Sequence, residues 1–265
     1  MKKRYFLFLS IVLLYACTSS PTGNTNELSI KDDKLAGFLL GGIYFFHGYG
    51  GANAVFDMVK AGAKQELKTK EFVEELGRNY TEIMVFPFTA EQAISSKETL
   101  EQSWKIKDKS TFLSTLDFLK KSGHQDEFLI YKKMMDENGG ANVDITKIGA
   151  NTDEEVKRKL EFIKNNYAAI STTGIKAWDY ARYVNNVCLG YSAEYITKEE
   201  GEKLVADLSK DARSMYSNWD EYYKDYIMGL KYWGSGQEND AEYSKVCKEM
   251  MEGDYSIYKY LSLKQ

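Results

Sequence analysis

Polar residues interrupt the apolar face of a helix predicted over residues 174–191. At about 100° per residue, Arg182 and Asn185 fall inside the apolar stripe, and Asp179 lies at its margin. An unpaired buried charge costs several kcal/mol, so Arg182 requires a partner. Asp179 stands three residues earlier, within reach on the surface of the same helix.

Two interpretations of these residues remain open. In the first, which we favour, Asp179 and Arg182 form a structural ion pair that orders helix ends, and Asn185 bonds a loop carbonyl. In the second, the three residues line a cleft together with His124, whose imidazole acts as an acid, a base or a ligand contact. His124 follows Gly123, and a turn at this glycine aims the ring inward.

The sequence contains no other motif that indicates catalysis or metal binding. Its two histidines, His47 and His124, occur without an H-E-x-x-H or paired C-x-x-C pattern, so we expect no metal site. Residues 190–194 lack the final glycine of G-x-S-x-G, and residues 47–51 read as a glycine-rich helix break. Both phosphate-binding glycine loops are missing as well, so we expect no cofactor.

The elements that must position these residues read as consecutive helices. Capping boxes predict helix starts at Thr89, Thr152 and Thr197, Ser217 offers a further N-cap, and Gly123 ends a helix. Strand signals at 83–86 and 143–145 are short, and we expect loops or helix ends there. The sequence therefore predicts an all-α fold, with a single compact multi-helix domain over residues 34–265.

An aromatic stripe marks the helix predicted over residues 218–233. Its members share one face of the helix and are Trp219, Tyr222, Tyr223, Tyr226, Leu230 and Trp233. A continuous stripe opposite a charged face is typical of a core helix. The alternative is a platform that stacks against a glycan, and we favour the core.

The first residues resemble a bacterial lipoprotein signal peptide. Lys2, Lys3 and Arg4 precede a short apolar run, which ends at the stretch Leu-Tyr-Ala-Cys over residues 14–17, similar to a lipobox. The resemblance implies a signal peptide over residues 1–16 and acylation of Cys17, with two acyl chains anchoring the protein stably in the lipid bilayer. We therefore expect a lipid-anchored protein of the cell envelope, with its domain in the periplasm.

The residues after the lipobox support a tethered arrangement. Residues 17–33 form the lipidated N-terminus and a short flexible tether. No aspartate follows Cys17, which favours the outer membrane over the inner one. The formal charge is −4, and removal of the three positive residues of the signal peptide lowers it to −7. Such a charge argues against nucleic acid as a partner.

The two other cysteines, Cys188 and Cys247, lie in a compartment that permits oxidation. One alternative is a disulfide between them. The other, which we favour, is a pair of free thiols in the core, since both stand in helical patterns among apolar neighbours.

Two blocks of the sequence resemble the bacterial domain-of-unknown-function family 1266. The first covers about 103–124 and the second 174–233. The matching residues are Trp104-Lys105-Ile106, Leu116, Leu119 and Gly123-His124, then Trp178-Asp179, Arg182, Gly190-Tyr191, Glu199-Glu200, Ser217-Asn218-Trp219, Tyr226, Gly229 and Trp233. Lys105 replaces a commoner glycine and Gln125 a commoner arginine. The resemblance implies a helical fold and carries no catalytic assignment.

Together these observations predict a membrane-anchored envelope protein that acts as a non-enzymatic binding or protein-interaction module, with another envelope protein as its partner. The alternative is a ligand-processing or hydrolase-like enzyme that uses His124, Asp179 and Arg182.

Overall fold

The structure is a computed structural model that describes residues 30–63, 68–86, 89–148, 153–234 and 237–264. It confirms the predicted helical fold, and the described residues form no strand beyond an isolated bridge between Ile30 and Leu261. The helices are α1 (Asp33–Leu39), α2 (Gly42–Gly48), α3 (Ala52–Gly62), α4 (Thr69–Asn79), α5 (Ala90–Trp104), α6 (Lys109–Lys121), α7 (Gln125–Glu137), α8 (Glu154–Asn166), α9 (Lys176–Ser192), α10 (Lys198–Met215), α11 (Trp219–Trp233) and α12 (Gln237–Glu252). Short helical turns lie at Tyr80–Met84, Gly140–Asn142, Ile145–Ile148, Tyr167–Ala169 and Ile257–Lys259.

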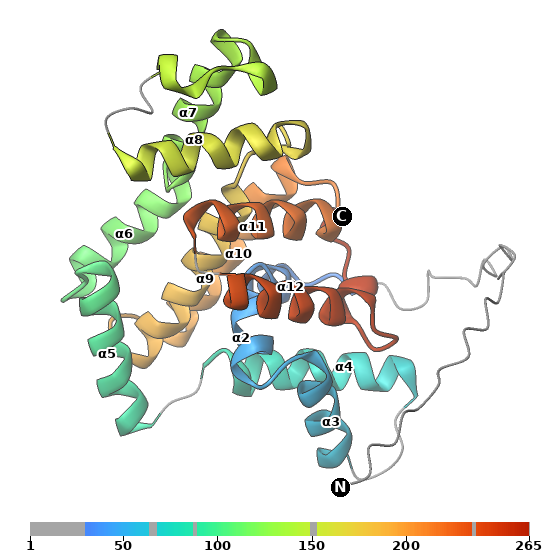
Figure 1. Ribbon diagram of the computed structural model, residues 1–265. Helices are drawn as coiled ribbons and strands as arrows, with labels where there is room; N and C mark the ends of the chain where they lie inside the picture. The colour runs from blue at the N-terminus through green and yellow to red at the C-terminus, as the bar shows by residue number, and fades with distance from the viewer. Residues whose placement is uncertain (1–29, 64–67, 87–88, 149–152, 235–236, 265) are drawn as a thin grey trace, which may run out of the picture.

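Helix α9 lies at the centre of the fold, where it packs against α2, α5, α6, α10 and α11 (Figure 1). Helix α10 also packs against α1, and α12 packs against α2, α3 and α11. Most of α9 is buried, as expected for a helix surrounded by five others. A polar residue on α9 therefore lies in the core unless it faces a helix end or a gap between neighbouring helices.

The predicted helix starts agree with the structure at two positions and shift by one residue at a third. Thr197 and Glu200 form the reciprocal capping box of α10, and Thr89 caps α5 by accepting a hydrogen bond from the Gln92 N–H. The N-cap of α11 is Asn218 and not Ser217, because the Asn218 side chain accepts from the Glu221 N–H at 2.8 Å.

At the remaining predicted start, Thr152 lies outside the described residues. Asp153 is the N-cap of α8 and accepts hydrogen bonds from the two backbone N–H groups of Glu155 and Val156. Threonine and aspartate can both act as an N-cap. Asp153 occupies this position because it directly precedes α8, where its carboxylate reaches the free N–H groups of the first turn.

The aromatic stripe of α11 forms part of the main hydrophobic core, as predicted for all its members but one. Trp219, Tyr222, Tyr223, Tyr226 and Leu230 are buried against α1, α2, α9 and the C-terminal turn, where they join the largest apolar cluster. Trp233 differs, since 41% of it stays exposed at the end of α11. This exposed ring lies beside His124, which places it at the candidate site.

A second apolar cluster lies under α7 and α8, at the top of the view in Figure 1. It consists of Phe128, Met135, Val143, Leu160, Ile163, Ile175 and Tyr232. This cluster fixes α7 against α8 and against the ends of α9 and α11. The start of α7, which carries His124, is therefore fixed by its packing against α8 and against the ends of α9 and α11.

The glycine-rich residues 47–51 form the predicted helix break, between α2 and α3. Within the described residues, no helix combines the length and the apolar character needed to cross a membrane. Residues 1–29, and with them Cys17 and the predicted signal peptide and tether up to that point, lie outside the described residues.

Candidate functional site

The candidate site begins with His124 and Asp179, which meet where the α6–α7 turn contacts α9. Asp179 is fully buried, and its Oδ1 accepts hydrogen bonds from the His124 backbone N–H at 2.9 Å and from Nδ1 at 2.8 Å. Its Oδ2 accepts from the Gln125 N–H at 3.0 Å. The carboxylate therefore caps the N-terminus of α7 from another helix, where a negative charge also favours the helix dipole.

Gly123 permits this contact. It ends α6 with a φ of 68°, and a Cβ atom at this position would lie 2.1 Å from Asp179 Oδ2. Glycine alone combines the left-handed backbone with room for the carboxylate. The predicted helix stop at Gly123 is confirmed, and the close approach of Asp179 gives it a second cause.

Arg182 lies one turn further along α9, between two tryptophan rings. Its Cζ is 4.2 Å from the ring centroid of Trp104, at the end of α5, and 4.2 Å from that of Trp178. Two aromatic faces at this distance attract the guanidinium through cation–π interactions, each contributing on the order of 1 kcal/mol. The side chain is half-buried beside these two rings.

The expected ion pair between Asp179 and Arg182 is not formed. Arg182 Nη1 lies 3.4 Å from Nδ1 and 3.3 Å from Nε2 of His124, so it faces the ring and not the lone pair of one nitrogen. Asp179 instead binds His124 and the start of α7. The imidazole separates the carboxylate from the guanidinium, and the three predicted residues meet in this order at one place.

Aromatic rings surround the His124 imidazole. The centroids of Trp233, Trp178, Phe118 and Trp104 lie 4.6, 5.1, 5.7 and 6.2 Å from its own. Only 16% of the His124 side chain is exposed. The four rings come from α5, α6, α9 and α11, so the histidine joins the ends of these helices to the start of α7.

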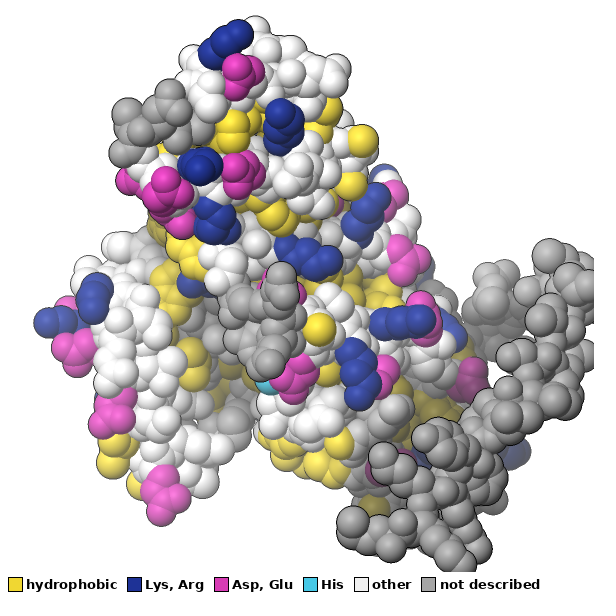
Figure 2. Space-filling view, viewed as in Figure 1, with side chains coloured by type: hydrophobic (Ala, Val, Ile, Leu, Met, Phe, Trp, Pro, Cys, Tyr) yellow, Lys and Arg dark blue, Asp and Glu magenta, His cyan; other side chains and the backbone are white. Residues whose placement is uncertain are grey.

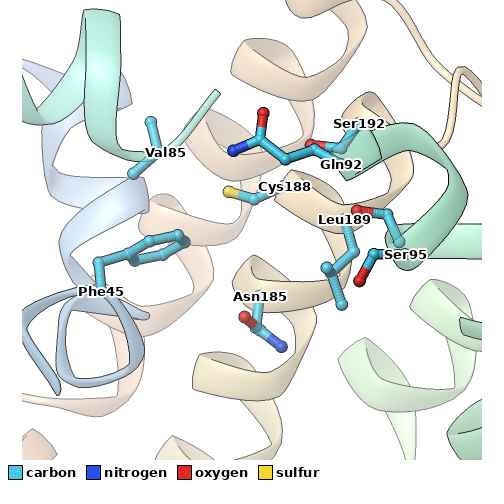
Figure 3. A pocket seen from close by; sticks show the side chains of 9 residues that line it. Phe45, Val85, Gln92, Ser95, Asn185, Cys188, Leu189 and Ser192 are labelled. Atoms are coloured by element: carbon cyan, nitrogen blue, oxygen red, sulfur yellow. The ribbon is translucent and has the colours of Figure 1, made fainter. Parts of the chain in front are cut away.

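Asn185 does not bond a loop carbonyl in the part of the chain that the structure describes. It lines a pocket of ≈ 220 Å³ between α2, α5 and α9. Figure 3 shows the side chains of Asn185 and Leu189 from α9, Gln92 from α5 and Phe45 from α2 around the same space. The surface in Figure 2 is hollowed between α5 and the body of the molecule. This part of the α9 face is therefore open, which explains a polar residue in its apolar stripe.

The two cysteines do not form a disulfide. Cys188 on α9 and Cys247 on α12 are free, buried thiols, in agreement with the interpretation that we favoured. Burial raises the pKa of the Cys247 thiol to about 12 and that of Cys188 well above its ordinary value. Neither thiol is therefore activated as a nucleophile, although Cys188 lines the pocket.

Sequence reasoning missed a buried lysine beside the site. Lys176 Nζ donates to the carbonyl oxygens of Leu119, Lys121 and Ser122 at 3.1–3.4 Å, at the end of α6. Burial lowers the pKa of Lys176, while the charge of Asp179 opposes this shift. A cation at a helix C-terminus is stabilised by the dipole, so Lys176 and Asp179 bind the two helix ends on either side of Gly123.

Gln125 also has a defined place in the structure. Its Oε1 accepts from the Ile175 N–H at 2.7 Å, and its Nε2 donates to the Thr173 carbonyl at 2.6 Å. An arginine, the commoner residue in the resemblance, has no acceptor for the Ile175 N–H. The described residues contain no group of three His, Cys, Asp or Glu side chains arranged to hold a metal ion.

Comparisons with known proteins agree with the two blocks. The model of a family described as "Protein of unknown function (DUF1266)" matches residues 99–263. The chain is similar to two uncharacterized proteins of Escherichia coli (strain K12), YbeR (26% identical over 141 residues) and YbeU (26% over 145 residues). The alignments cover 53% of this chain, which spans 59% of the length of either relative. No solved structure matches the chain significantly. Because the family match covers more than half of the chain and includes every residue of the His124, Asp179 and Arg182 cluster, the protein belongs to the DUF1266 family.

Proposed function

We propose that this protein is a non-enzymatic binding module of the bacterial cell envelope, which holds a segment of another envelope protein in the pocket between α2, α5 and α9. The lipobox-like residues 14–17 support an anchor through acylated Cys17. The domain then works in the periplasm, tethered to the outer membrane. Binding takes place on the central helix of the fold, beside the residues shared with the family.

One observation carries this proposal: the pocket is lined by residues with hydrogen-bonding groups for which the described part of the chain provides no partner. Gln92 Oε1 is buried and has no hydrogen-bond partner in the described part of the chain, and the Asn185 amide has none there either. A buried acceptor such as Gln92 Oε1 costs about 1–3 kcal/mol when it stays unpaired, whereas the Asn185 amide is open to solvent and free to bond a ligand. The backbone of an incoming segment offers both donors and acceptors, and Phe45 and Leu189 provide apolar contact.

The geometry favours binding over the alternative of a ligand-processing enzyme. A general base needs a free acceptor within reach of substrate. In this site, Asp179 is fully buried and already accepts three hydrogen bonds, and four rings enclose His124. These two residues hold helix ends together, whereas Arg182 and Asn185 face the open side of α9.

The proposal is tested by photocrosslinking in intact cells with a benzophenone amino acid at Ser95, which lines the pocket on α5. The control places the same amino acid at Glu98, which is exposed on α5 outside the pocket lining. We expect a discrete crosslinked protein from position 95 and not from position 98.

A blocking variant makes this result specific. Leu189→Arg fills the pocket with a charged side chain and should abolish the crosslink, whereas Leu129→Arg, on an exposed apolar position of α7, should not. Circular dichroism verifies that both variants fold. Equal crosslinking from positions 95 and 98, or a crosslink that survives Leu189→Arg, contradicts the proposed pocket.

The anchor has a separate test. Cys17→Ala should abolish metabolic labelling with a fatty-acid analogue and move the protein from the membrane fraction to the soluble fraction. Labelling that persists in this variant contradicts acylation at Cys17.

A further inference from the structure

Arg182 differs from the other arginines that the structure describes. Three of them form an ion pair with a carboxylate, namely Arg78 with Glu75, Arg158 with Glu155 and Arg213 with Asp33. Arg182 has no carboxylate oxygen within 4.0 Å among the described residues, although it is more enclosed than Arg78. The arginine of the family cluster is the one whose charge the described chain does not pair directly.

The neighbouring carboxylate does not serve Arg182. Both oxygens of Asp179 accept hydrogen bonds from His124 and Gln125, so Asp179 acts on the guanidinium through its charge alone. Burial lowers the pKa of Arg182, while the charges of Tyr44 and Asp179 oppose this effect. The guanidinium has lost part of its hydration without gaining an ion pair in return.

Trp104 and Trp178 also hold the guanidinium ready for a ligand. Both ring centroids lie 4.2 Å from its Cζ, so a partner reaches the guanidinium through its N–H groups. None of its nitrogen atoms belongs to the buried atoms without a hydrogen-bond partner, so the free N–H groups reach solvent. A fixed guanidinium loses little rotamer freedom on binding.

We propose that Arg182 binds a carboxylate group of the segment that occupies the pocket between α2, α5 and α9. This inference rests on the proposed function and adds the chemical group that is recognised. The edge of a guanidinium presents two parallel N–H groups, which match the two oxygens of a carboxylate. Asn185, one turn further along α9, lies between Arg182 and the rest of the pocket lining and provides an amide donor.

The surroundings favour a carboxylate over a phosphate. The protein has a net charge of −4, which opposes the approach of a multiply charged anion. The two tryptophan rings, each 4.2 Å from Cζ, limit the room beside the guanidinium, which favours the smaller carboxylate group. Burial raises the pKa of Tyr44 to about 12, against the effect of the Arg182 charge, so Tyr44 stays neutral and does not pair with the guanidinium as an anion.

The test measures binding of small probes to the purified domain by tryptophan fluorescence, because Trp104 and Trp178 lie against the guanidinium that binds the carboxylate. N-acetyl-leucine supplies a free carboxylate, and N-acetyl-leucinamide has the same side chain without it. We expect N-acetyl-leucine to bind at least about tenfold more tightly than the amide, as a charge-assisted bidentate contact predicts. The carboxylate of the bound segment belongs either to its C-terminus or to an acidic side chain. The α-amide of N-acetylglutamate distinguishes these two sources, because it carries only a side-chain carboxylate and binds only if the site accepts one.

Two variants connect the effect to the residue. Arg182→Gln should remove the difference between acid and amide, and Arg182→Lys should retain part of it. If Arg182→Gln does not fold, Asn185→Ala provides the second variant and should weaken N-acetyl-leucine more than its amide. The comparison of acid with amide on the unaltered protein requires no variant.

Three results overturn the inference: equal binding of acid and amide, tighter binding of inorganic phosphate than of N-acetyl-leucine, or no saturable carboxylate binding below about 10 mM. Failure here is distinct from failure of the proposed function. If the crosslink from position 95 depends on Leu189 but persists in Arg182→Gln, the pocket binds its partner without the carboxylate contact.

Discussion

Removing the Asp179 carboxylate should destabilise the fold more than any surface substitution, because three buried donors lose their acceptor. These are the backbone N–H groups of His124 and Gln125 and the Nδ1–H group of His124. A buried donor left without a partner costs about 1–3 kcal/mol. Allowing for partial compensation by water, we expect Asp179→Ala to lower the free energy of unfolding by about 3–6 kcal/mol, a large part of the 5–15 kcal/mol typical of a domain.

Matched variants separate this cap from the general effect of charge. Asp126→Ala removes an exposed carboxylate from the first turn of the same helix, α7, and should cost less than about 1 kcal/mol. Asp179→Asn retains one acceptor but turns an amide donor towards another donor. Its loss of unfolding free energy should therefore lie between the losses of Asp179→Ala and Asp126→Ala. Urea-induced unfolding followed by circular dichroism measures all three. An Asp179→Ala variant as stable as Asp126→Ala refutes the cap.

A double-mutant cycle tests whether His124 acts in the same unit. His124→Phe retains an aromatic ring among its four neighbours but removes Nδ1–H. The loss in the double variant should be smaller than the sum of the two single losses by about 0.5–3 kcal/mol, since both remove the same hydrogen bond. Additive losses would show that Asp179 stabilises the backbone of α7 independently of the imidazole.

Three further predictions follow from single residues. Lys105 ends α5 with a φ of 58°, so Lys105→Gly should stabilise the protein by about 0.5–1 kcal/mol relative to Lys105→Ala, which loses the same side chain but keeps the strained Cβ, as measured by urea unfolding. Asn186 is fully buried and both of its amide atoms lack a partner among the described residues, so Asn186→Leu should leave the melting temperature unchanged or raise it, and a clear decrease would reveal a bound water or ligand. Burial raises the pKa of the Asp225 carboxyl, although the hydroxyls of Thr173 and Ser171 oppose the shift. The folded state then keeps this proton to higher pH than the unfolded chain, so the stability it contributes is lost as the pH rises through the folded value. Above about pH 4, the ordinary range of an aspartate, Asp225→Asn should reduce that loss in unfolding measurements, and an unchanged pH dependence would contradict it.

The secondary structure was predictable because its signals are local. A capping box such as Thr197 with Glu200 requires contacts over three residues, and the stripe of α11 repeats within one helix. The one-residue shift from Ser217 to Asn218 is local too, since either side chain can cap the helix and the one with the better geometry does so. The pattern therefore predicts the element but not its exact first residue.

The contacts of the site were not predictable in the same way, because they join distant residues. A helical wheel identifies Arg182 as out of place, yet Asp179 is the only carboxylate it offers within reach on the same helix. The structure supplies other partners, namely His124, 58 residues earlier in the chain, and Trp104 on α5. A wheel also cannot show that α5 leaves part of α9 uncovered, which is the reason that Asn185 stands in an apolar stripe.

The residues of the family cluster restrict one another, and this explains most of the motif without any ligand. Gly123 leaves room for Asp179, which holds His124 and the start of α7, and the imidazole and two tryptophans in turn enclose Arg182. The polar groups of Asp179 that take part in these contacts all have hydrogen-bond partners. The Arg182 guanidinium, in contrast, forms no ion pair in the described chain, and the two tryptophan rings offset its lost hydration only through cation–π contacts. The charge at this position is therefore the feature that the proposed carboxylate contact accounts for.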